Sequence, residues 1–289
     1  MNAIERAKLA LDGLSIGDAF GERLMHASTA SRATAFGNRV APKGPWSWTD
    51  DTAMACSIVD ELAAGAGIAP ASLAKRFARR YAAEPARGYG SGAHQVLADI
   101  AAGVPYEGAA TKLFGGEGSR GNGGGMRAAP IGAYYCDDLD GTADHAARSA
   151  APTHAHPDGA AGAVAVAIAA ACAFAGQRDP RALLETVVAR TPAGPTRDGV
   201  RRATAMIGAD PITVAAELGN GSRVLAADTI PFAVWCAASH LADYASALWA
   251  CASVGGDVDT TCAMVGGIVV GAVGLAGIPD AWRASREPL

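Results

Sequence analysis

Two clusters of aspartate and threonine, far apart in the sequence, carry the residue types best suited to bind a divalent cation. The first is Trp48-Thr49-Asp50-Asp51-Thr52, and the second is Gly255-Gly256-Asp257-Val258-Asp259-Thr260-Thr261. Four carboxylates brought together in a mostly apolar protein repel one another strongly, so a site made from both clusters needs positive charge. Ligands that are all oxygen atoms favour Mg²⁺, Mn²⁺ or Ca²⁺. We therefore expect the two clusters to meet at a metal centre.

Each cluster also fits the start of a helix. An apolar run rich in Ala and Gly follows both clusters. Asp and Thr are favoured as N-caps, and a carboxylate suits the positive end of the helix dipole. For either cluster alone, the cap and the metal ligand are both open interpretations, and the two are compatible.

A glycine-rich segment is a second candidate element of a binding site. It reads Gly115-Gly116-Glu117-Gly118-Ser119-Arg120-Gly121-Asn122-Gly123-Gly124-Gly125-Met126-Arg127. Glycines let the backbone approach a ligand closely, and successive amides can hold a diphosphate if a helix begins just after them. The segment is not a P-loop, because no Gly-Lys-Ser/Thr follows, and no strand precedes it as in a dinucleotide fingerprint. Glycine content alone favours a flexible surface loop.

Two histidines lie in the segment Thr153-His154-Ala155-His156-Pro157-Asp158, just before a long helical pattern. No cysteine or third histidine has a spacing that would complete a zinc site. We therefore expect a contact to ribose or phosphate, or a helix-entry turn capped by Asp158.

Composition and charge exclude several classes of protein. The 289 residues are 50% hydrophobic, enough for a sizeable core, and carry a net charge of -4 without a Lys/Arg-rich run. No nucleic-acid surface or anionic-membrane surface is therefore expected. The N-terminus lacks the apolar region of a secretory signal, and the apolar stretch 262–278 is glycine-rich, as in a buried helix rather than a membrane span. The six scattered cysteines predict reduced thiols in a cytoplasmic protein.

Helical periodicity runs through most of the chain. Apolar residues recur at three- and four-residue spacing in segments 51–63, 70–82, 92–102, 158–175, 180–190, 226–242 and 260–276. Strand alternation and hairpin dipeptides are lacking. The Gly/Pro breaks at 41–46, 88–92, 115–125 and 219–222 are short, so they predict loops rather than an interdomain linker. Because the aspartate clusters must meet in space, we expect one compact all-α domain over residues 1–289.

Six short motifs, taken together, are characteristic of one known family. They are Gly17-Asp18-Ala19-Phe20-Gly21, Thr49-Asp50-Asp51-Thr52, Arg87-Gly88-Tyr89-Gly90, Gly121-Asn122-Gly123-Gly124-Gly125-Met126-Arg127, Thr153-His154 and Gly256-Asp257-Val258-Asp259-Thr260-Thr261. In these motifs and their order the chain resembles the ADP-ribosylglycohydrolase family, which includes the dinitrogenase-reductase-activating glycohydrolase. The likeness runs over about residues 5–276, and six motifs in register are far more specific than any one of them.

The resemblance implies an all-α hydrolase with two Mg²⁺ or Mn²⁺ ions at the base of a cleft. Such an enzyme cleaves the bond between ADP-ribose and an acceptor and releases ADP-ribose. Matched residue by residue, the metal ligands would be Thr49, Asp50, Asp51, Asp257, Asp259 and Thr260, with Asp259 bridging the ions. The aspartates beside the metals, Asp50, Asp51 and Asp259, are also the candidate catalytic groups, although base and acid are not assigned individually.

The same matching implies a substrate-binding set. Gly118, Ser119, Gly121, Asn122, Gly123 and Met126 would line the diphosphate and ribose, and His154 would lie beside the distal ribose. Phe114 falls where relatives stack an aromatic ring on adenine. Arg120 stands where some relatives have a second aromatic residue, and a guanidinium can also stack on a purine.

One departure from the family pattern concerns a carboxylate on the first helical segment. Relatives commonly carry a glutamate seven residues after the aspartate of the first glycine motif, where this chain has Met25. Glu22, four residues after Asp18, lies on roughly the same helical face and is a candidate catalytic replacement. The alternative is that Glu22 is an ordinary surface residue.

Two other classes of protein are alternatives to the hydrolase. A terpene or prenyl synthase would need an acid at Met54 to complete its aspartate motif, and an aromatic content of 6% is poor for a cation-stabilising pocket. A non-catalytic ADP-ribose-binding module would explain Met25. However, degenerate sites usually lose buried carboxylates, because burying clustered charges destabilises the fold.

The acceptor is the open question. A mono-ADP-ribosylated protein side chain such as arginine is our first expectation, and a nucleic acid or small molecule remains an alternative. We expect a monomer without a membrane partner.

Overall fold

The computed structural model describes residues 1–289, and it is built from helices joined by short loops. The helices are α1 (Ala3–Met25), α2 (Thr29–Asn38), α3 (Asp50–Ala63), α4 (Pro70–Ala83), α5 (Ser91–Ala101), α6 (Tyr106–Thr111), η1 (Leu113–Gly116), α7 (Gly123–Met126), α8 (Ala129–Tyr134), α9 (Leu139–Ala150), α10 (Pro157–Phe174), α11 (Pro180–Arg190), α12 (Pro195–Ala205), α13 (Pro211–Leu218), α14 (Ala226–Ser239), α15 (Tyr244–Ala252), α16 (Val258–Val273), η2 (Leu275–Gly277) and α17 (Asp280–Ser285). No strand forms, so the all-α prediction is confirmed.

The helices predicted from periodicity correspond to α3, α4, α5, α10, α11, α14 and α16, with ends that differ by at most three residues. The other helices were not predicted. Several of these are short, and the longest, α1 with 23 residues, has a nearly continuous buried stretch in its second half.

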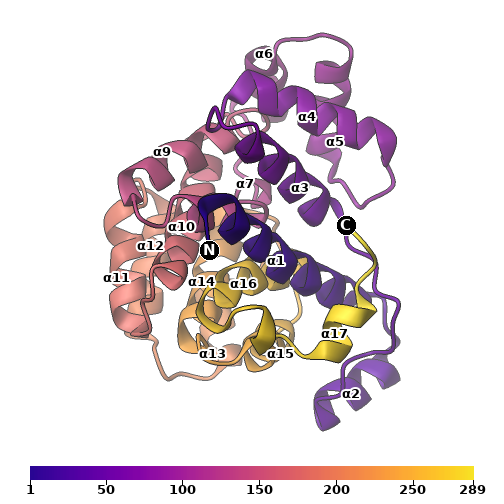
Figure 1. The fold of residues 1–289 in the computed structure, drawn as a ribbon, viewed down its shortest axis with the longest axis vertical. Coiled ribbons are helices and arrows are strands. Elements are labelled where there is room, and N and C mark those ends of the chain that lie inside the picture. Colours follow the sequence, from indigo (N-terminus) through magenta and orange to yellow (C-terminus); the bar gives the residue numbers. More distant parts are fainter.

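The centre of the molecule is the close contact between α1 and α16, which lie side by side in Figure 1. Gly13, Gly17 and Gly21 follow one another at four-residue spacing on α1 and form one face. A Cβ atom on each of them would overlap a carbonyl oxygen of α16, namely that of Gly266, Cys262 and Val258 in turn. Only a hydrogen in place of a side chain allows this approach. The glycines thus fix how close α1 comes to the second aspartate cluster.

α10 is long and apolar enough to cross a membrane by length and composition. In the structure 78% of this segment is buried, against α8, α9 and α16. The sequence pointed instead to residues 262–278, which the structure divides between α16 and η2. Both α10 and α16 are core helices, which explains why their patterns are apolar all round.

The C-terminal residues of the chain and Arg87 hold the segment that leads into α3. The amide of Trp46 donates to the carbonyl of Ser285 at 2.7 Å, and the amide of Trp48 donates to Glu287 Oε1 at 2.9 Å. Arg87 stacks over the Trp48 ring at 3.5 Å and pairs with the same Glu287 carboxylate. The start of α3, and with it the first aspartate cluster, is therefore anchored on both sides.

Candidate active site

The first aspartate cluster is the start of α3, as the capping interpretation predicts. Thr49 is the N-cap, and its Oγ1 accepts from the amide of Asp51 at 3.3 Å. Asp50 and Asp51 occupy the first turn, where the helix dipole favours negative charge. The Thr49 cap leaves the two carboxylates free for another role, so capping is compatible with metal ligation here.

The second cluster begins α16 but does not cap it. Asp257 is the N-cap residue, yet its side chain makes no bond to the helix amides. Its Oδ2 accepts instead from Asn122 Nδ2 at 2.6 Å, and Asn122 Nδ2 also lies 3.1 Å from Thr229 Oγ1. Asn122 therefore ties the glycine-rich segment to the second aspartate cluster.

Asp18 links the two clusters, and sequence reasoning did not place it in the site. It lies fully buried on α1, one residue after Gly17. Its carboxylate accepts from the amide and hydroxyl of Thr49, both at 2.9 Å, and from the amide and hydroxyl of Thr52 at 3.1 and 2.5 Å. The signal that could have identified it is its own motif, because a carboxylate flanked by glycines on a buried helix face needs a partner.

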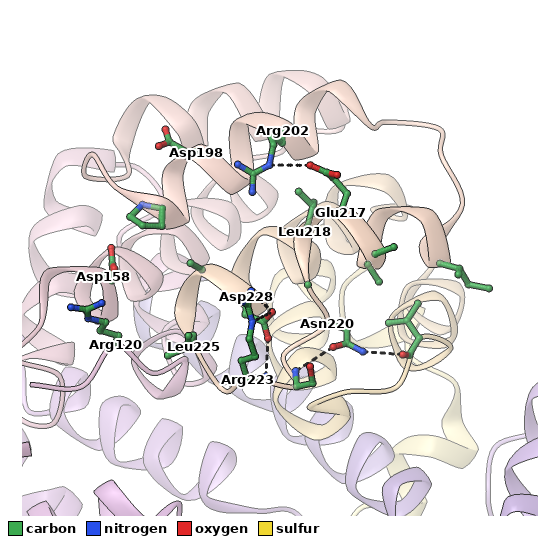
Figure 2. Close-up of a pocket in the computed structure, with 18 of the residues that line it drawn as sticks. Arg120, Asp158, Asp198, Arg202, Glu217, Leu218, Asn220, Arg223, Leu225 and Asp228 are labelled. Carbon is green, nitrogen blue, oxygen red and sulfur yellow. Dashed lines mark hydrogen bonds and ion pairs between the residues drawn. The ribbon is translucent and has the colours of Figure 1, made fainter. Parts of the chain in front are cut away.

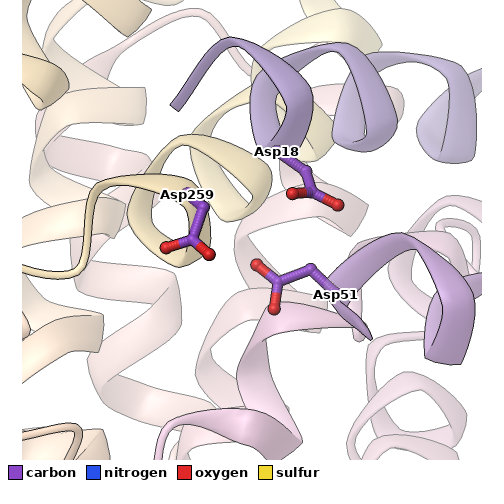
Figure 3. Close-up of side chains that lie close together, drawn as sticks. All are labelled: Asp18, Asp51 and Asp259. Atoms are coloured by element: carbon purple, nitrogen blue, oxygen red, sulfur yellow. The ribbon is translucent and has the colours of Figure 1, made fainter. Parts of the chain in front are cut away.

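Carboxylates from three helices converge where α1, α3 and α16 meet. Figure 3 shows Asp18, Asp51 and Asp259 directed toward one another, and one oxygen from each lies within 4.8 Å of the others. Asp51 Oδ2 and Asp259 Oδ1 are buried without a hydrogen-bond partner. Orphaned carboxylate oxygens are costly unless a cation or proton satisfies them. The donor set therefore fits a hard divalent cation with oxygen ligands.

The electrostatics of the cluster agree with that assignment. Burial, together with the nearby Asp18 and Asp257, raises the pKa of Asp50 to about 7. Burial also raises the pKa of Asp51 and of Asp259 well above the usual range, reinforced by neighbouring carboxylates. Asp18 has a pKa of about 6, because burial outweighs its four hydrogen bonds. Without a cation, several of these groups would be protonated near neutral pH.

A cavity of about 770 Å³ opens onto the aspartates. Its wall contains all of the predicted site residues except Thr49 and Glu22, namely Asp50, Asp51, Asp257, Asp259, Thr260, Phe114, Gly118, Ser119, Arg120, Gly121, Asn122, Gly123, Met126 and His154. Phe114 is 66% exposed there, and Arg120 is held by an ion pair to Glu117 at 2.8 Å. The structure thus gathers the residues around one space, while their individual roles stay predictions.

The glycine-rich segment is fixed in place and forms one wall of this cavity. Gly121 pairs with Leu225, and Asn122 N donates to the carbonyl of Val224 at 3.2 Å. Gly124 and Gly125 are buried. A Cβ on Gly124 would lie 2.8 Å from the carbonyl oxygen of Gly159 on α10. The flexible-loop alternative therefore fails for this part of the segment, because α10 and the 221–226 loop hold it on both sides.

The two predicted histidines have different positions. His154 is buried on the cavity wall, and its Nδ1 lies 2.8 Å from Thr153 Oγ1. His156 is the N-cap of α10, where its Nδ1 accepts from the amide of Asp158 at 3.1 Å. The cap of this helix is therefore His156, and the prediction that Asp158 caps the turn is wrong. A histidine can cap because a neutral ring nitrogen is an acceptor.

Thr49 and Glu22 lie outside the residues that line the cavity. The Thr49 hydroxyl donates to Asp18, so its part in metal binding would require its remaining lone pair. Glu22 Oε1 lies 3.1 Å from His26 Nε2 on the same helix. The catalytic role of Glu22 stays a prediction, and the observed pairing is what a surface carboxylate would make.

A second cavity, of about 1060 Å³, lies beside the first (Figure 2). The two share Arg120, Arg223 and Leu225 in their walls. Its charged groups are largely paired with one another: Arg223 with Asp228 at 2.8 Å and Arg202 with Glu217 at 3.5 Å. It has no cluster of unpartnered carboxylates comparable with that of the first cavity.

Comparison with known proteins agrees with this geometry. The family model described as ADP-ribosylglycohydrolase matches residues 1–288. The chain belongs to the ADP-ribosylglycohydrolase family. The resemblance seen in the six motifs is thereby confirmed, and the protein is a glycohydrolase enzyme.

Individual relatives match most of the chain. ADP-ribosylhydrolase ARH3 of Mus musculus is 29% identical over 330 residues, covering 99% of this chain and 88% of the relative. The ARH3 proteins of Bos taurus and Homo sapiens are each 30% identical, with 83% of this chain and 74% of the relative covered. A solved ADP-ribosylglycohydrolase-related protein complex superposes with a TM-score of 0.69 over 99% of this chain and 93% of that chain, at 24% identity. That last similarity concerns the fold alone.

Proposed function

We propose that this ADP-ribosylglycohydrolase hydrolyses the bond between ADP-ribose and a mono-ADP-ribosylated protein side chain, such as arginine, and releases ADP-ribose. The observation that carries the proposal is the single cavity in which a buried aspartate cluster faces an ordered glycine-rich wall. The aspartate cluster supplies ligands for cations, and the backbone of the glycine-rich wall can approach a diphosphate closely.

We propose that two Mg²⁺ or Mn²⁺ ions occupy the aspartate cluster. The residues that would hold them are Thr49, Asp50, Asp51, Asp257, Asp259 and Thr260, supported by the unpartnered oxygens of Asp51 and Asp259. When bound, such ions orient vicinal hydroxyls and a water molecule and stabilise developing charge. Asp18 accepts hydrogen bonds from Thr49 and Thr52, and so ties the start of α3 to α1, which packs against α16.

The residues of the chain would bind and orient the substrate as follows. Phe114 offers an exposed ring for adenine at the rim of the cavity. The Gly118–Gly123 backbone lies open to the diphosphate, and Asn122 couples that wall to Asp257. An ionised aspartate beside the cluster is then the base available to a water molecule.

A panel of mono-ADP-ribosylated acceptors tests the proposal. Each acceptor, linked through nitrogen or oxygen to protein, nucleic acid or a small molecule, is incubated with the enzyme, and free ADP-ribose is quantified. Release from arginine-linked protein supports the proposal as stated. Release only from another acceptor would show that this acceptor, and not a protein arginine, is the leaving group. Release from none of them would contradict hydrolysis of such bonds.

A further inference from the structure

A buried arginine outside the predicted site residues lies in the wall of the cavity. Arg127 is 1% exposed and follows the glycine-rich segment. It donates from Nη1 to the carbonyl of Gly123 at 2.9 Å, and from Nη2 to the carbonyl of Ser149 at 3.0 Å and to Thr153 Oγ1 at 2.8 Å. Its guanidinium also packs over the Phe77 ring. Burial of a charge in this way is costly, so its fixed contacts require an explanation.

The hydroxyl of Thr153 connects Arg127 to His154. It accepts from Arg127, so its single proton is left for another acceptor. Two acceptors are in range: His154 Nδ1 at 2.8 Å and the carbonyl of Ala150 at 3.5 Å. The shorter bond is the better one, and a hydroxyl polarised by a cation is a stronger donor. The network therefore makes Nδ1 of His154 an acceptor, which leaves the ring proton on Nε2.

The glycines of the cavity wall leave Nε2 open to a ligand. A Cβ on Gly121 would lie 3.4 Å from His154 Nε2, and a Cβ on Gly123 would lie 3.3 Å from it. Nδ1 is engaged by Thr153, and Nε2 makes no hydrogen bond within the protein. Burial and the Arg127 charge lower the pKa of His154 to about 3, which keeps the ring neutral.

We infer that Arg127 and Thr153 are positioning residues, which hold His154 as the neutral tautomer that presents an Nε2 proton to an acceptor oxygen of ADP-ribose. The inference rests on the proposed function only in taking ADP-ribose as the ligand. A ring held in this way donates to a hydroxyl oxygen of the distal ribose, and it cannot accept from a ligand hydroxyl. Arg127 thus acts on the ligand through Thr153 and His154.

Nitrogen-15 NMR of the labelled full-length protein tests the tautomer directly. We expect His154 to show an unprotonated, pyridine-type Nδ1 and a protonated, pyrrole-type Nε2, unchanged from about pH 5 to about pH 8. The His154→Gln variant identifies the signals by their loss. A protonated Nδ1, or an imidazolium signal near pH 6, would overturn the inference whether or not the protein binds ADP-ribose.

Two substitutions at Thr153 test the consequence for binding. Thr153→Val removes the hydroxyl at nearly constant shape, and we expect ADP-ribose affinity to fall about tenfold, as for one lost hydrogen bond to a fixed donor. Thr153→Ser keeps the hydroxyl and should stay within about twofold of the wild type. AMP, which lacks the distal ribose, should bind both variants alike.

The control ligands separate the possible outcomes. Equal loss of AMP and ADP-ribose affinity in Thr153→Val, or the same loss in Thr153→Ser, would show a general structural role and contradict the inference. If the wild type bound no ADP-ribose, the proposed function would fail, and the nitrogen signals would still decide the tautomer.

Discussion

Asp51 and Asp259 are the residues whose surroundings most favour a cation. Each has one oxygen that is buried and unpartnered, and each sits among other carboxylates. Their types and spacing were sufficient to predict a metal site from the sequence. Asp18 could not be predicted in the same way, because its contacts to Thr49 and Thr52 depend on how α1 packs against α3.

Replacing Asp259 with asparagine should separate ligation from folding. Asp259→Asn keeps the shape and removes one charge, so we expect kcat to fall by on the order of 100-fold or more, as the metals lose a ligand. The metal-free variant should melt at a higher temperature than the metal-free wild type, because like-charge repulsion is relieved. Asp60→Asn is the matched control, since Asp60 lies on the exposed face of α3 and pairs with Arg80. Wild-type turnover in Asp259→Asn would contradict the role of this carboxylate.

Glu22 lies where the chain departs from its family. Its carboxylate pairs with His26 and it is not among the residues that line the cavity. We therefore expect Glu22→Gln to change kcat by less than about threefold, since an exposed ion pair contributes little. Steady-state kinetics and ADP-ribose binding are measured together. A large loss of kcat at unchanged affinity would show an interaction made in the transition state, and Glu22 would then be catalytic.

At the scale of elements, the contact between α1 and α16 positions the site. Hydrophobic periodicity predicted α16 and most of the long helices, because each has a recognisable polar boundary or amphipathic face. It could not predict that α1 pairs with α16, since that contact depends on three glycines that matter only once the two helices meet. The same holds for the glycine-rich wall, whose order comes from α10 and the 221–226 loop.

Gly17→Ala tests this contact. The added methyl group would overlap the Cys262 carbonyl on α16, so we expect a loss of about 1–3 kcal/mol in the free energy of unfolding. Activity should fall as well, because Asp18 moves with α1. Gly37→Ala is the control, since its Cβ would meet nothing within 4 Å on the exposed face of α2. There we expect a gain of about 0.5–1 kcal/mol in denaturant unfolding. A silent Gly17→Ala would show that α1 and α16 can separate without cost.

At the scale of the whole molecule, the fold brings charges from both ends of the chain into one buried cluster. The fold class followed from the sequence because helical patterns and six motifs agree. The shape of the cavity did not, because it depends on how α3, the glycine-rich segment, the 221–226 loop and the start of α16 come together. The second cavity of Figure 2 had no sequence signal at all, since its lining comes from scattered single residues.

The stability of the metal-free enzyme should fall as pH rises through the titration of the cluster. Asp18 and Asp50 have folded-state pKa values of about 6 and about 7, above the ordinary value of 3.8. Between about pH 3.8 and pH 7, the folded protein therefore binds more protons than the unfolded chain. The free energy of unfolding that these protons contribute is lost as pH rises through this range. His154 acts in the opposite direction, since its lowered pKa reduces stability as pH falls below about 6.5.

A comparison with Asp50→Asn isolates the contribution of the Asp50 carboxylate to the pH dependence of the free energy of unfolding, because both proteins keep His154. We expect the metal-free wild type to lose free energy of unfolding relative to this variant as pH rises from about 4.5 to about 7.5. Urea denaturation at each pH measures the difference. A difference that stays constant with pH would contradict the raised pKa of Asp50.

The central claim is that hydrolysis depends on cations held by the aspartate cluster, and one measurement tests it most directly. The enzyme is stripped with a chelator and dialysed, and release of ADP-ribose from an accepted substrate is followed after adding Mg²⁺, Mn²⁺ or Zn²⁺ in turn. We expect no turnover without metal, recovery with Mg²⁺ or Mn²⁺, and poor recovery with Zn²⁺, which prefers nitrogen and sulfur ligands. Full turnover by the metal-free enzyme would contradict the account.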